Sequence, residues 1–179
     1  MSKKVAMTGM FVALAMIFSY VEVLIPINLG IPGMKLGLAN LVVVVTLYTL
    51  GIQTAFAVSA VRILLVAMTF GSMSAMLYSL AGGILSFSGM TLLKKMPCFS
   101  VVGVSAAGGV LHNAGQLAVA MAVVENVNLI AYFPPLTVAG TITGTLIGFV
   151  SLKVIPRVKP MMKYCLESYK FLLFHKCGM

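Results

Sequence analysis

The stretch "VVGVSAAGGVLHNAGQLAVAMAVV", residues 101–124, decides the fold. It exceeds the roughly 20 residues that a helix needs to cross the hydrocarbon core of a bilayer, and it contains no Lys, Arg, Asp or Glu. Its middle nevertheless carries His112, Asn113 and Gln116. Buried hydrogen-bonding groups are costly unless they are satisfied. The stretch therefore predicts a membrane-spanning helix whose polar face needs a partner.

The composition of the whole chain extends this prediction. Of its 179 residues, 61% are hydrophobic and only 8% are charged, whereas roughly 25% are charged in a typical soluble domain. A net charge of +9 is common in nucleic-acid-binding proteins, but here the basic residues flank apolar segments, where the positive-inside rule places cytoplasmic charge. We expect an integral membrane protein whose partner is the lipid bilayer and not a nucleic acid.

Apolar segments divide the chain into six predicted spans, at residues 5–25, 36–50, 52–70, 73–93, 100–124 and 128–152. The second segment is short and follows the Pro- and Gly-rich stretch 26–37. With the N-terminus inside, the Lys94–Lys95 pair and the basic tail both fall in the cytoplasm. We predict an all-α, six-transmembrane-helix bundle over residues 1–159 with both termini cytoplasmic. Residues 160–179 are predicted to form a basic, amphipathic cytoplasmic tail.

Small residues mark the faces on which these helices pack. Gly140, Gly144 and Gly148 form a GxxxGxxxG ridge in the sixth segment, and such ridges let helices approach closely in lipid. Gly109, on the polar face of the fifth segment, leaves room for a ligand or for a neighbouring backbone.

Residues for catalysis are scarce. The chain has no Asp, and its only carboxylates are Glu22, Glu125 and Glu167. The Asp-rich sites that hold diphosphates through Mg²⁺ are therefore excluded. The phosphate-binding loop GxxxxGK[ST] is also absent from the sequence. The three cysteines lack the spacing of a zinc site. We expect no catalytic residues, no bound metal and no cofactor.

The polar groups inside the spans are the candidates for a binding site. His112, Asn113 and Gln116 share one helix face, because residues three and four apart are neighbours on a helix. Arg62 lies about 15 Å from the inner end of its span, where an arginine costs roughly 2.5–3.5 kcal/mol on insertion scales. Such a residue is expected to face the bundle interior and to find a partner there.

Two interpretations of these groups stay open. In the structural one, Arg62 pairs with Glu22 and the three polar residues of the fifth segment bond neighbouring helices. In the functional one, the same residues line a substrate pocket with Lys35 and Asn40 at its mouth. The second is favoured because the polar groups concentrate in the outer half, beneath the irregular stretch 26–37.

Four motifs carry a resemblance to a known family: "GIPGMKLGLAN" (30–40), "LYSLAGGILSF" (77–87), "GVSAAGGVLHNAGQ" (103–116) and "YFPPLTVAGTITG" (132–144). They resemble the Gx transporter family, also named heptaprenyl diphosphate synthase component I. Tyr132, which opens the last motif, completes the candidate substrate-binding residues. The family is similar to the substrate-binding S components of energy-coupling-factor (ECF) transporters of the prokaryotic plasma membrane.

This resemblance implies a multi-pass subunit that captures a small micronutrient or precursor and works with a transmembrane coupling protein and two ATPase subunits. In S components a small-xxx-small patch on the first helix docks the coupling protein, and Gly9 and Ala13 stand at that spacing here. The synthase name implies an alternative, a non-catalytic membrane partner of a prenyl diphosphate synthase. A stand-alone carrier is a third possibility.

Overall fold

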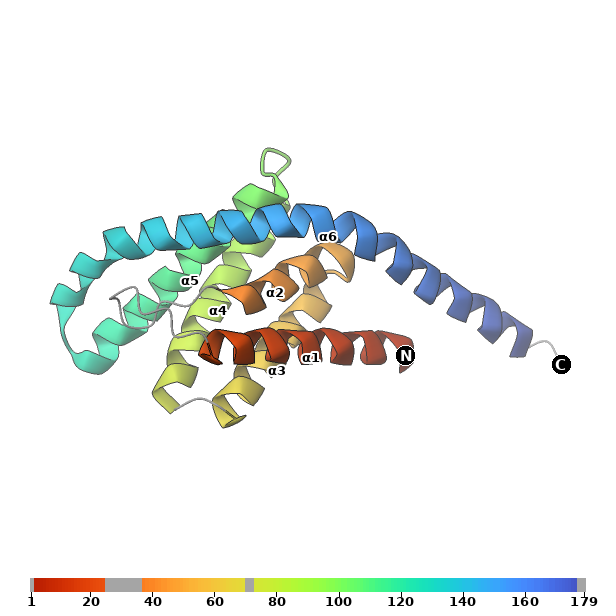
Figure 1. Cartoon of the computed structure of the whole chain (residues 1–179), viewed down its shortest axis with the longest axis horizontal. Coiled ribbons are helices and arrows are strands. Elements are labelled where there is room, and N and C mark those ends of the chain that lie inside the picture. The colour runs from red at the N-terminus through yellow and green to blue at the C-terminus, as the bar shows by residue number, and fades with distance from the viewer. Residues whose placement is uncertain (1, 25–36, 70–72, 177–179) are drawn as a thin grey trace.

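The computed structural model describes residues 2–24, 37–69 and 73–176, and these ranges are helical almost throughout (Figure 1). The α-helices are α1 (Ser2–Leu24), α2 (Leu38–Thr49), α3 (Ile52–Thr69), α4 (Met73–Lys94), α5 (Val101–Val124) and α6 (Phe133–Lys176). A 3-10 helix, η1 (Val127–Tyr132), joins α5 to α6. The described ranges contain no strand, so the all-α prediction is confirmed.

The surface of the bundle is apolar, as lipid requires. Of the helices that the structure describes, five are long and apolar enough to cross a membrane. On α6, Ile142, Leu146 and Phe149 follow one face at helical spacing, and each is more than half exposed. In water a continuous apolar face of this kind would drive association. The chain is therefore a multi-pass membrane protein.

The second predicted span, residues 36–50, forms the short helix α2. Its 12 residues extend only about 18 Å at 1.5 Å per residue, against a hydrocarbon core of roughly 30 Å. All six residues from Val42 to Leu47 are buried, which explains why the middle of this helix is almost entirely apolar. It fills the centre of the bundle, and the exact number of membrane crossings stays a prediction.

Both ends of α2 are fixed by the surrounding chain. Gly37, at its N-terminus, and Gly51, just after its C-terminus, have φ angles of 74° and 93°, values that favour glycine. The backbone N–H groups of Leu50 and Gly51 both donate to the carbonyl of Thr46. The ammonium group of Lys94 donates to the carbonyl of Leu47 over 2.5 Å.

Helix α5 packs against α4 and α6 at backbone distance through glycines. A Cβ added at Gly109 would lie 2.3 Å from the Gly140 carbonyl oxygen of α6. A Cβ added at Gly115 would lie 2.8 Å from the Ala81 carbonyl oxygen of α4. The tight packing predicted for the α6 glycine ridge is confirmed, and the room beside Gly109 is filled by a neighbouring backbone.

Helix α6 continues well past the predicted end of the sixth span. Its Met162 is buried in a cluster with Met7 and Phe11 of α1, and the helix then extends beyond the bundle (Figure 1). Two residues inside it, Pro156 and Pro160, lack the N–H of a regular helix. The division of the chain at residue 160 therefore falls within a continuous helix, and a separate tail unit stays a prediction.

Candidate substrate-binding site

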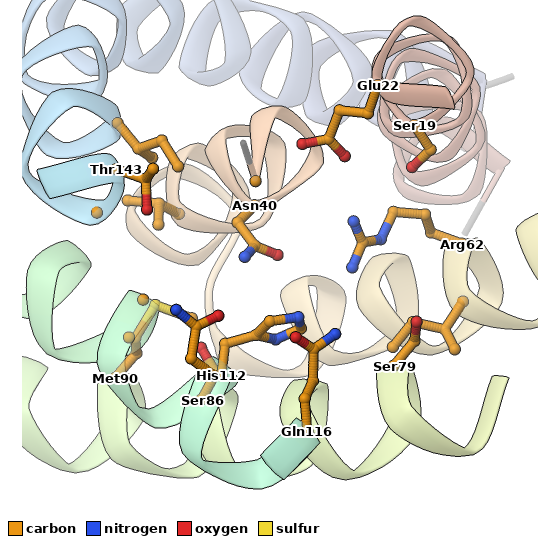
Figure 2. A pocket seen from close by; sticks show the side chains of 18 of the residues that line it. Ser19, Glu22, Asn40, Arg62, Ser79, Ser86, Met90, His112, Gln116 and Thr143 are labelled. Carbon is orange, nitrogen blue, oxygen red and sulfur yellow. The ribbon is translucent and has the colours of Figure 1, made fainter. Parts of the chain in front are cut away.

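A cavity of about 520 Å³ lies between the helices, and all six α-helices contribute to its lining. This volume is within the range of roughly 300–1,000 Å³ that is usual for small-molecule sites. Apolar walls include Val44, Ile63, Met90 and Ile147. The polar side chains of the lining are those of Ser19, Glu22, Asn40, Arg62, Ser79, Ser86, Ser105, His112, Asn113, Gln116 and Thr143 (Figure 2).

The structure brings together six of the eight candidate substrate-binding residues around this cavity: Glu22, Asn40, Arg62, His112, Asn113 and Gln116. Lys35 lies outside the described residues. Tyr132 does not line the cavity but lies in η1, with 44% of its surface exposed. The substrate-binding role of all eight residues remains a prediction.

Arg62 is the permanent cation of the described lining. It lies on the face of α3 that also buries Ala55, Val58 and Ser59, and only 8% of its surface is exposed. Its guanidinium group points into the cavity (Figure 2). The Nε–H is buried and has no hydrogen-bond acceptor among the residues that the structure describes. Because an unsatisfied buried donor is costly, this atom marks a place for an acceptor.

Glu22 connects the cavity to the start of α2. Its Oε1 accepts a hydrogen bond from the backbone N–H of Leu38 over 2.6 Å, and the N-cap residue of this helix, Gly37, has no side chain with which to cap it. A carboxylate is favourable at this position because helix N-termini carry partial positive charge. The charge of Glu22 also attracts Arg62. Glu22 therefore bonds the start of α2 as well as attracting Arg62, the partner that the structural interpretation gave it.

The polar face of α5 has an interhelical hydrogen bond. Asn113 Nδ2 donates to the backbone carbonyl of Leu136 in α6 over 2.8 Å. This bond is of the kind that the structural interpretation proposed, and it satisfies one N–H of the Asn113 amide. It forms because the glycine contacts bring α6 close enough for a short amide side chain to reach its backbone. The substrate-binding role of Asn113 stays a prediction.

Glycines of α4 make room for the other two residues of that face. A Cβ at Gly82 would lie 2.8 Å from the His112 carbonyl oxygen and 2.9 Å from Gln116 Cγ. A side chain at position 82 would therefore push α5 and its polar face away. The "AGG" at residues 81–83 was a visible signal of close packing, but its link to the cavity was not.

Serines and a threonine are the lining residues that sequence reasoning missed as site residues. Ser79 and Ser86 repeat at seven-residue spacing in α4, which equally fits helix packing. Ser86 and Ser105 are buried, at 4% and 3% exposure. Thr143 donates to the Ala139 carbonyl within α6, which leaves its oxygen lone pairs as an acceptor toward the cavity.

The described lining suits binding more than bond-breaking chemistry. Its one carboxylate is Glu22, so it offers no pair of carboxylates for acid–base catalysis. Among the described residues, no three His, Cys, Asp or Glu side chains gather closely enough to hold a metal ion. The lining instead combines one cation, hydrogen-bonding groups and apolar walls.

Comparison with known protein families adds a family assignment. The profile of the family described as heptaprenyl diphosphate synthase component I matches residues 11–154. The chain belongs to this family. The match includes every residue that lines the cavity and confirms the resemblance noted from the four motifs. No curated protein and no solved structure matches the chain. Similarity to ECF S components stays a prediction.

Proposed function

We propose that this protein is the substrate-binding membrane subunit of an ECF-type importer, and that the cavity receives a small micronutrient or precursor. The observation that carries the proposal is the buried Arg62, which lines a cavity of about 520 Å³ and whose Nε–H has no acceptor among the described residues. A buried arginine within the membrane is expensive. A ligand that supplies an oxygen acceptor would offset that cost, and Arg62 would then be a ligand-binding residue.

The importer also needs subunits that this chain does not supply. The sequence contains no phosphate-binding loop, so ATP hydrolysis falls to two ATPase subunits and a transmembrane coupling protein. Gly9 and Ala13 lie on an exposed face of α1, and no described atom comes within 4 Å of a Cβ built at Gly9. A partner helix could approach this face closely, which supports it as the docking surface.

The membrane orientation follows from charge. Lys94 ends α4 and Lys95 follows it, and the middle of α6 carries Lys153, Arg157 and Lys159. Basic residues gather on the cytoplasmic side of membrane proteins. We therefore assign both termini to the cytoplasm of a prokaryotic cell and the opening of the cavity to the outside of its plasma membrane.

A second candidate function comes from the family description, which names a component of heptaprenyl diphosphate synthase. In that case the chain would be a membrane partner, and the chemical step would belong to another subunit because this sequence has no Asp. Affinity capture of the chain from its native membrane distinguishes the two. Co-purification of ATPases supports the importer, and co-purification of a prenyl synthase subunit supports the alternative.

The experiment for the cavity itself is native mass spectrometry of the gently purified protein. Wild type should carry a small molecule that Arg62→Met loses. The matched control is Arg157→Met, which removes an exposed arginine of α6 and should retain the molecule. Equal retention by Arg62→Met, or no bound molecule in any of the three proteins, would contradict the proposal.

A further inference from the structure

The charges of the cavity restrict the class of ligand. Among the described residues of the lining, the permanent charges are one guanidinium, Arg62, and one carboxylate, Glu22. We propose that the cavity selects an elongated molecule with a single carboxylate, which binds Arg62, and that Glu22 excludes diphosphates and other multiply charged anions. This inference rests on the proposed substrate-binding function and assigns the charge selectivity to one residue.

Arg62 has the geometry for a carboxylate. A guanidinium group presents N–H donors in a planar fork that matches the two oxygens of a carboxylate. One of those donors, the Nε–H, is buried without an acceptor among the described residues, and the group points into the cavity (Figure 2). A ligand carboxylate would satisfy this donor and compensate the positive charge in a single contact.

Glu22 limits how much negative charge the ligand can carry. Its Oε1 is held by the Leu38 N–H at the N-terminus of α2, so its charge is fixed beside the position that the ligand carboxylate would take. In a medium of low dielectric constant, like charges at close range repel by several kcal/mol. A diphosphate would bring two or more negative charges to one arginine and one nearby carboxylate, and it would bind poorly.

The length of the cavity indicates that the part of the ligand beyond its carboxylate is elongated. Its lining extends from Met76 to Met90 along α4, which is about 21 Å at 1.5 Å per residue. Arg62, Ser19 and Ser79 lie at one side of the cavity, whereas Met90, Ser86 and Thr143 lie at the other (Figure 2). A carboxylate at Arg62 therefore leaves space for a long body that runs toward Met90.

A matched pair of probes tests whether the cavity prefers a single carboxylate to a diphosphate. Geranate and geranyl diphosphate share one ten-carbon isoprenoid skeleton, whose first carbon is the carboxylate in geranate and carries the more highly charged diphosphate in the other probe. Binding of each to the purified full-length protein in detergent would be measured by titration. Wild type should bind geranate at least tenfold more tightly than geranyl diphosphate. Arg62→Met should weaken geranate binding roughly 10- to 150-fold, and Arg157→Met should leave it unchanged.

Two further variants separate the charge of each residue from its hydrogen-bond geometry. Glu22→Gln keeps an oxygen for the Leu38 N–H but removes the negative charge. Its affinity for geranyl diphosphate should therefore be at least about tenfold higher than that of wild type. Arg62→Lys keeps the charge without the planar fork, and its affinity for geranate should fall between those of wild type and Arg62→Met.

Four results would overturn the inference. They are a preference of wild type for geranyl diphosphate, no binding of either probe, equal binding of the two probes, and no gain in diphosphate affinity in Glu22→Gln. Preference for the diphosphate would leave the cavity standing as a binding site. The proposed function fails separately, if the native protein carries no small molecule that depends on Arg62.

Discussion

Replacing Gly109 with alanine should force α5 and α6 apart. The new Cβ would lie 2.3 Å from the Gly140 carbonyl oxygen and 3.3 Å from Gly144 Cα. The first distance is about 1 Å below ordinary van der Waals contact, which begins at 3.4 Å. Both neighbours are backbone atoms, so no side-chain rotation can relieve the clash and the helices themselves have to move.

The magnitude follows from two opposing terms. Overpacking of a close-packed interior costs roughly 1–3 kcal/mol, whereas replacing glycine with alanine in a helix contributes at most about 1 kcal/mol in favour of the variant. A shift at Gly109 would also loosen the neighbouring contact of Gly144 with the Ser105 carbonyl, where a Cβ would lie at 2.6 Å. Because the clash is with backbone atoms, the cost should lie near the upper end of its range, and we expect Gly109→Ala to lower the free energy of unfolding by about 2 kcal/mol.

The assay is denaturant unfolding in detergent micelles, with Gly103→Ala as the control on the same helix. A Cβ at Gly103 meets its nearest neighbours at 3.4 and 3.8 Å, which is ordinary contact. The control should unfold like wild type within about 0.5 kcal/mol, or be slightly more stable. If Gly109→Ala matched Gly103→Ala in stability, α5 and α6 would not meet at backbone distance and the packing described here would be wrong.

Other predictions concern stability, topology and assembly. Asn113→Leu removes the bond to the Leu136 carbonyl and should lower the free energy of unfolding by about 0.6–1.7 kcal/mol; unchanged stability would show that this bond contributes nothing. Cys98 is exposed, and in a chain whose other cysteines are replaced by serine it should resist impermeant thiol reagents added to intact cells. Robust labelling there would reverse the assigned orientation. Gly9→Leu and Ala13→Leu should each reduce co-purification of a coupling subunit without changing ligand binding, and full co-purification of both variants would move the docking surface elsewhere.

Most of the helical framework could be predicted from the sequence because apolar runs in lipid have few alternatives to helix. The run at 100–124 became α5 at Val101–Val124, and the run at 73–93 became α4 at Met73–Lys94. The unusual shortness of the second segment was also visible, since turn-forming residues precede it. The central position of this segment in the bundle could not be predicted, because a short apolar run fits a buried helix and a short membrane span equally well.

The candidate site could be predicted less completely because its partners come from distant segments. The residues Arg62, His112 and Gln116 stood out as polar groups in apolar runs, and the cavity brings them together. The attachment of Glu22 to the start of α2, across 16 residues, depends on how α1 packs beside α2. The bond from Asn113 reaches 23 residues along the chain. Neither contact follows from spacing on one helix.

The most direct test of the cavity as the ligand site is to fill it. Ser79→Leu adds an apolar side chain to the lining, and Ser88→Leu makes the same change on the exposed face of α4. The quantity to measure is the molar amount of small molecule that co-purifies with each variant, by native mass spectrometry. If the cavity holds the ligand, wild type and Ser88→Leu should carry equal amounts, and Ser79→Leu should carry little while remaining folded. Full retention of the molecule by Ser79→Leu would show that the ligand binds elsewhere.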